Sequence, residues 1–277
     1  MNKIIKIALI ALVSLAIVGV AVYFFRSTKG DGGQVDLPKT NFSQEIARRV
    51  EQMANMTESD AQKEFKSLMG LIATAQQSGN VDGKEAALCN KSVVYQYAPM
   101  LKLWADQCFA QSSWSASQVD AYGADAQQLL SRQVLEPKSK MAADLNTIVQ
   151  TVKDYHGAVA ASHVGGCTTV AAVNAAINRA KSFSGKRLPF DVKASLSAVP
   201  GKAKDALAKN IAGSCNSLAG QWSSISYDAF CAKYDGVRAR KNEYVSAFGS
   251  NSSLSSAWNA LESARARAID RAADSEW

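Results

Sequence analysis

The chain has 277 residues, of which 47% are hydrophobic and 20% are charged, with only 5 prolines. This length suffices for one large domain or two small ones, each with a real core. The net charge of +7 includes +4 from Lys3, Lys6, Arg26 and Lys29, which leaves +3 on residues 30–277. So modest a charge argues against a nucleic-acid partner.

The first predicted element is an apolar helix. The nineteen residues Ile7 to Phe25 are uncharged, and Lys6 and Arg26 flank them. At about 1.5 Å per residue they span roughly 28 Å, close to the thickness of a bilayer's hydrocarbon core. The run is long for a cleaved signal peptide and ends without small residues for a peptidase. We interpret residues 1–26 as a signal anchor that crosses the membrane and contacts its lipid.

The next stretch predicts a tether and an orientation. Residues 27–41 contain Gly30, Gly32, Gly33 and Pro38 and have no apolar period, which is typical of a flexible tether. Basic residues stand on both sides of the anchor, and their balance favours a cytoplasmic N-terminus. We therefore expect residues 42–277 to be extracytoplasmic, in a periplasm or outside the cell.

From Phe42 onward, apolar residues recur every three or four positions, as in amphipathic helices. The resulting fold prediction is all-α: an irregular antiparallel bundle of about nine helices, with no strand alternation and no repeat period. In chain order, the predicted helical stretches are 42–53, 57–77, 86–108, 119–133, 137–163, 170–180, a short turn from Asp191 to Pro200, 207–222, 226–248 and 254–272.

Side chains that cap helices support several of these boundaries. Thr57 with Asp60 matches a helix start, and Thr168 or Thr169 can cap the helix that follows residue 169. Pro137 suits the first turn of a helix, and Ser226 precedes another.

Pro99 leaves two interpretations of the longest stretch. The unbroken apolar stripe from Ala86 to Cys108 favours one kinked helix, which would hold Cys89 and Cys108 about 28 Å apart. The alternative places Pro99 at the first position of a new helix. Those two cysteines would then be equidistant from a turn and able to pair.

The five cysteines all follow the anchor and form no C-x-x-C pair. In an oxidising compartment we expect at least one disulfide and one unpaired thiol. Cys215 and Cys231 lie equally far from Ser223, in the turn of a predicted helical hairpin, so this bridge is the first candidate. Cys89, Cys108 and Cys167 are the other candidates.

No residue pattern predicts a metal or cofactor. His156, His163 and Cys167 have a spacing that one helical face can offer to a metal, but Gly165 and Gly166 interrupt the helix and no further ligand follows. We therefore expect no catalytic, cofactor-binding or metal residue.

Enzyme signatures are also missing. The chain has no nucleophile-elbow, zinc-protease or phosphate-loop motif. We interpret its carboxylates as helix caps or solvated surface, including Glu58, Asp60, Asp205, Asp228 and Asp235. The protein is thus predicted not to be an enzyme.

Most aromatic residues lie on the predicted core stripes, for example Trp104, Trp222, Tyr234 and Trp258. The exceptions are Trp114, in a polar connection, and the terminal Trp277. We expect the aromatic residues on the core stripes to pack in the core rather than to line a ligand groove.

These features together predict a membrane-anchored protein that acts in protein–protein interaction or scaffolding, for example as a subunit of a cell-envelope assembly. Its partner is expected to be another protein or further copies of the chain. The alternative is an extracytoplasmic sensor or small-ligand-binding bundle. An apolar cavity lined by tyrosine and tryptophan would favour the alternative, and a filled core with an exposed apolar patch would favour the scaffold.

Overall fold

The computed structural model describes residues 42–274. The anchor predicted at residues 1–26 and the tether at 27–41 lie outside this range. Within it, no helix is both long enough and apolar enough to cross a bilayer. All the packing described below lies within one compact unit, Ile46–Trp277.

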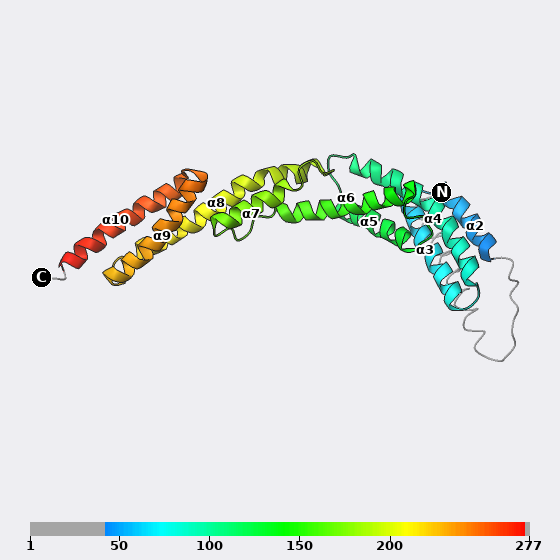
Figure 1. The fold of residues 1–277 in the computed structure, drawn as a ribbon, viewed down its shortest axis with the longest axis horizontal. Helices are drawn as coiled ribbons and strands as arrows, with labels where there is room; N and C mark the ends of the chain where they lie inside the picture. Colours follow the sequence, from blue (N-terminus) through cyan, green and yellow to red (C-terminus); the bar gives the residue numbers. More distant parts are fainter. Residues whose placement is uncertain (1–41, 275–277) are drawn as a thin grey trace, which may run out of the picture. The chain divides into compact units, whose positions relative to one another are not determined.

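The described residues form nine α-helices and no strand, which confirms the all-α prediction (Figure 1). In chain order the helices are α2 (Phe42–Met53), α3 (Glu58–Gln77), α4 (Gly83–Phe109), α5 (Ala116–Ser131), α6 (Lys140–Ser162), α7 (Val170–Lys181), α8 (Phe190–Gly220), α9 (Tyr227–Phe248) and α10 (Ser252–Asp274).

Short polar side chains fix where several helices begin. The Thr57 hydroxyl accepts a hydrogen bond from the Asp60 amide at 3.3 Å, and Ser226 accepts one from Ala229 at 3.3 Å, as the sequence predicts. Of the two threonines considered before α7, Thr169 is the cap. The start predicted at Pro137 was wrong, because Ser139 caps α6 instead.

Two long helices continue through a proline. The single helix α4 contains Pro99, which confirms the favoured interpretation of that stretch. Helix α8 likewise contains Pro200, so the predicted break there was wrong. An internal proline costs a helix about 3 kcal/mol. In α8 the buried residues Val199, Ala203 and Leu207 keep one apolar face continuous across the proline, and their burial offsets this cost.

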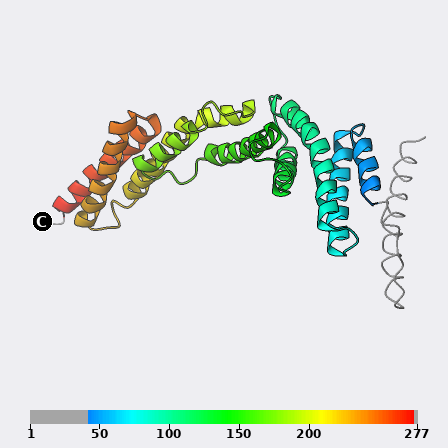
Figure 2. The same ribbon diagram turned by 45° about the vertical axis from the view of Figure 1, so that its right-hand side comes forward.

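Helices that are close in sequence pack together. In this compact unit, α3 lies beside α4, and α4 also contacts α5 and α6 (Figure 2). Further along, α8 packs against α6, α7, α9 and α10. The described helix pairs in contact lie at most two places apart along the chain.

One large apolar cluster surrounds α8. Its central residues come from the inner faces of α8, α9 and α10, among them Ile211, Cys215, Phe230, Tyr234 and Leu261. All five are less than 5% exposed. Burial on this scale, rather than helix propensity, is what stabilises long helices in water.

The expected disulfide is not formed. All five cysteines are free thiols, and four are buried. The α8–α9 hairpin does exist, but Cys215 points into the apolar cluster while Cys231 is partly exposed on α9. On α9 the buried positions are Phe230, Tyr234 and Tyr244, and Cys231 lies about 100° around the helix from Phe230. Cys215 therefore faces the apolar cluster and Cys231 does not.

Candidate functional site

An apolar stripe runs along the solvent side of α4. Leu88, Tyr95 and Leu103 are 67%, 46% and 57% exposed, and Pro99 between them is also exposed. At about 100° per residue these four positions fall within an arc of about 80°. We call Leu88, Tyr95, Pro99 and Leu103 the α4 stripe. Exposed apolar side chains that follow one helical face are typical of an interaction surface, whereas scattered ones are ordinary.

The rest of α4 is firmly packed, so the exposure of this stripe does not come from loose packing. Val93, Val94, Tyr97 and Leu101 are completely buried on its other faces. The Tyr97 ring stacks on Phe65 of α3, with ring centroids 4.2 Å apart. The helix therefore presents the stripe on a rigid support.

Three lysines line one edge of the stripe. Lys84, Lys91 and Lys102 fall about 40° to 60° around the helix from Leu88, all on the same side. The Lys91 ammonium lies over the Tyr95 ring, 5.6 Å from its centroid. Neither Lys84 nor Lys91 forms an ion pair with an acidic side chain of the described residues, whereas Lys102 pairs with Asp106.

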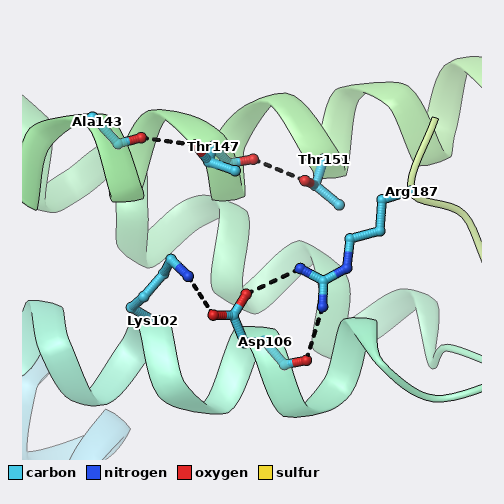
Figure 3. A network of polar contacts seen from close by, with 6 residues as sticks. All are labelled: Lys102, Asp106, Ala143, Thr147, Thr151 and Arg187. Carbon is cyan, nitrogen blue, oxygen red and sulfur yellow. Dashed lines mark hydrogen bonds and ion pairs between the residues drawn. The ribbon is translucent and has the colours of Figure 1, made fainter. Parts of the chain in front are cut away.

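Asp106 anchors the C-terminal end of α4 to the segment before α8 (Figure 3). Its carboxylate accepts from Lys102 and, at 3.0 Å, from Arg187, whose guanidinium also donates to the Asp106 carbonyl at 3.1 Å. Burial acts to raise the Asp106 pKa, but the hydrogen bonds from the two cations outweigh it and hold that pKa below its usual value. In Figure 3, Thr147 and Thr151 only bond back to carbonyls of their own helix α6.

A buried polar cluster joins α3, α4 and α5 behind the stripe. The Tyr97 hydroxyl donates to Asp125 at 2.7 Å, and the Tyr122 hydroxyl donates to Glu58 at 2.6 Å. Asp125 is only 1% exposed. Burial raises the pKa of the Asp125 carboxyl even though the Tyr97 hydrogen bond and the Lys66 charge act against the rise.

The two tyrosines of this cluster are held in their neutral, donating form. Burial raises the pKa of both hydroxyls above the usual tyrosine value, and the hydrogen bonds to Asp125 and Glu58 add to the rise. Tyr97 and Asp125 are enclosed within the cluster, while Glu58 and Gln118, which both bond to Tyr122, also line a surface hollow.

The residues considered for metal binding are not brought together. His156 pairs with Asp120, with Nε2 and Oδ1 2.5 Å apart, and His163 ends α6. Among the described residues no group of histidine, cysteine and carboxylate side chains is arranged to hold a metal ion.

The aromatic residues mostly occupy the core, as expected. Tyr234 and Tyr244 are buried in the cluster around α8, and Trp222 and Trp258 are partly buried against it. The interpretation of Trp114 as an exception was wrong. It is 8% exposed, packs between Phe109 and Tyr155, and donates its indole N–H to the Gln111 carbonyl at 3.1 Å. Trp277 lies outside the described residues.

Three surface hollows are candidates for the ligand site that the alternative function requires. They lie between α7 and α8, between α8 and α9, and beside Glu58, with volumes of about 360, 590 and 480 Å³. No tyrosine or tryptophan lines any of the three. Arg240, which borders the second hollow, is already bonded to Ser214 and Asn210.

The α4 stripe was not predicted from the sequence. The prediction for α4 rested on positions that are buried, such as Cys89, Val93 and Tyr97. A signal was present, because Leu88, Tyr95 and Leu103 repeat at helical spacing on a second face.

Comparisons with known proteins identify no relative of this chain. No family model, no curated protein and no solved structure matches the chain. The class that the structure defines is therefore an all-helical protein with a rigid, exposed apolar helix face.

Proposed function

We propose that this protein acts in protein–protein interaction or scaffolding, and that the α4 stripe is its contact surface. The observation that carries the proposal is the row of exposed Leu88, Tyr95 and Leu103 on a helix whose other faces are buried. Burying one large apolar side chain contributes about 1.5–3 kcal/mol. A partner that covers the row gains this contribution from each of the three side chains, which offsets part of the cost of association.

The setting we propose is a membrane surface. The apolar run in residues 1–26 supports an anchor with a cytoplasmic N-terminus, and residues 42–277 then stand outside as part of a cell-envelope assembly. Protease added to cells whose outer envelope is permeabilised and whose cytoplasmic membrane is intact is expected to degrade the helical domain. Protection of that domain until the cytoplasmic membrane is lysed would contradict this orientation.

The packing supports the scaffold over the ligand-binding alternative. The aromatic rings pack against one another, as in the stacked pair Phe65 and Tyr97, and the three hollows contain none of the tyrosines or tryptophans that a ligand site of that kind would use.

The test is the mass of the assembled particle. The full chain is expressed in a membrane host, solubilised gently, and measured by light scattering with mass spectrometry of the protein content. The wild type is expected to exceed the mass of one chain. The double variant Leu88→Ser/Leu103→Ser is expected to lose the added mass, because it removes the two leucines of the stripe without touching the core.

Ile269→Ser is the matched control, because Ile269 is also an exposed aliphatic residue, at 42%, but lies on α10. It is expected to keep the full particle mass. A wild type with the mass of a single chain, or equal behaviour of the stripe variant and the control, would overturn the proposal.

A further inference from the structure

The charges around the α4 stripe indicate what kind of partner fits it. Lys84 and Lys91 are both exposed, and no acidic side chain of the described residues pairs with either. Two unneutralised ammonium groups along one edge of an apolar strip favour a partner that carries negative charge at the same edge.

The shape of the stripe limits the partner further. From Leu88 to Leu103 it extends about 22 Å, which is about four helical turns. Its arc of about 80° is narrow, like the seam between two paired helices, whereas a helix that lies on a membrane buries a broader apolar face. A single amphipathic helix therefore matches both the length and the width.

A second copy of the chain fits less well. Leu88 and Leu103 lie at equal distances on either side of the Tyr95–Gln96 position, which suits antiparallel pairing of two α4 helices. In that pairing, however, the two-fold axis places both lysine edges on the same side of the interface. Lys91 of each copy would then come level with Lys102 of the other, so like charges would meet at two points. Lys84 would lie near Asp106 of the other copy, whose carboxylate already accepts from Lys102 and Arg187.

We propose that the α4 stripe binds an acidic amphipathic helix of another protein, with apolar residues against Leu88, Tyr95 and Leu103 and carboxylates beside Lys84 and Lys91. This inference rests on the proposed function and names the chemistry of the partner. Long-range attraction between the lysines and the carboxylates would speed association and weaken as salt rises.

The experiment uses the full chain in mild detergent and two labelled synthetic helices of about 18 residues. Both carry leucines at every third or fourth position. One has glutamates beside the leucines, and the other has lysines at the same positions. Fluorescence anisotropy is expected to show the acidic helix binding at least about tenfold more tightly at low salt, with the preference shrinking as salt increases.

Variants test whether the lysines and leucines of α4 cause the preference for the acidic helix. Lys84→Glu/Lys91→Glu is expected to reverse the preference, and Leu88→Ser is expected to weaken both peptides about tenfold. Ile269→Ser is expected to change neither. Circular dichroism confirms that each variant keeps its helical signal.

Three results would overturn the inference. One is equal binding of the two peptides. Another is self-association that Leu88→Ser abolishes, which would assign the stripe to a second copy. The third is binding through Leu88 to vesicles of phosphatidylcholine and phosphatidylglycerol in equal parts, which would assign it to a lipid surface. If the particle mass still depends on Leu88 and Leu103 while charge reversal has no effect, the proposed function stands and only the acidic partner fails.

Discussion

Tyr97 is the residue on which the buried cluster of α3, α4 and α5 depends. Its hydroxyl is the hydrogen-bond donor to Asp125, and both side chains are almost inaccessible to solvent. A buried polar group without a partner is costly, because it has given up water and gained nothing in exchange. The cluster therefore stabilises the fold only while both members are present.

Replacing Tyr97 with phenylalanine tests this point. The change is expected to lower the free energy of unfolding by about 1–3 kcal/mol, because it leaves the Asp125 carboxyl unpaired. Urea denaturation gives the measurement. Tyr95→Phe, two residues along the same helix but on the exposed stripe, is expected to stay within about 0.5 kcal/mol of the wild type. Equal losses in the two variants would contradict the role given to Tyr97.

Asp125 makes stability depend on pH. Its pKa in the folded protein is raised by burial, so the folded state binds this proton more tightly than the unfolded state does. The contribution to stability is then complete below the ordinary carboxyl pKa of about 4 and is lost as pH rises through the raised value. Lys66 and Tyr97 face this carboxyl and moderate the rise.

Asp125→Asn removes this titration and keeps an oxygen to accept from Tyr97. We expect the stability of the variant relative to the wild type to increase from pH about 4 to pH about 7. Urea denaturation at several pH values measures the difference. A difference that stays constant over this range would mean that the Asp125 pKa is not raised.

At the scale of the elements, Gly123 lies where α5 packs closely against α6. A Cβ added at Gly123 would lie 3.1 Å from Cγ1 of Val152, which is tighter than ordinary contact. Gly123 is buried on α5, so a larger side chain has to push α6 away.

Gly123→Leu is expected to lower the free energy of unfolding by about 1–3 kcal/mol through overpacking. The control is Gly213→Leu on the exposed side of α8, where an added Cβ meets nothing within 4 Å. The control is expected to raise stability by up to about 1 kcal/mol, because leucine favours a helix more than glycine does. Thermal unfolding of both variants compares them, and loss of stability in the control would show that the contact is not the cause.

Helix existence was predictable because it depends on local spacing. Apolar residues at every third or fourth position gave the helices, and caps such as Thr57 and Ser226 gave their starts. Pro200 was misjudged because a local rule ends a helix there, while burial on both sides of the proline keeps it intact. Trp114 was misjudged for a related reason, since its polar neighbours hide the aromatic contacts that enclose it.

At the scale of the whole described unit, contacts between near neighbours dominate. Each described helix packs against helices at most two places away in the chain. In such an arrangement stability approaches a sum of local contributions, so one part can loosen without the rest. The α4 stripe could not be predicted from the sequence of α4 alone. Which of the two apolar faces of α4 is exposed depends on the helices that pack against it.

The buried thiols can report this local behaviour. Cys89 and Cys108 lie in α4, while Cys167 and Cys215 belong to the cluster around α8. In the wild type all four are expected to react with a thiol reagent more slowly than the partly exposed Cys231. Gly123→Leu is expected to accelerate labelling of the α4 pair more than that of the other pair. An equal acceleration of all four would instead show that the unit opens cooperatively.

The proline within α4 gives the stripe a polar centre. Because Pro99 has no N–H, the Tyr95 carbonyl lacks the donor that a residue four places later supplies in an ordinary helix. This oxygen belongs to the same stretch of backbone that carries the exposed Tyr95 ring. A partner that covers the stripe therefore has to supply a hydroxyl, amide or ammonium near its middle, or else leave that oxygen dehydrated. This requirement sets the register of docking and discriminates against partners that are apolar along their whole length.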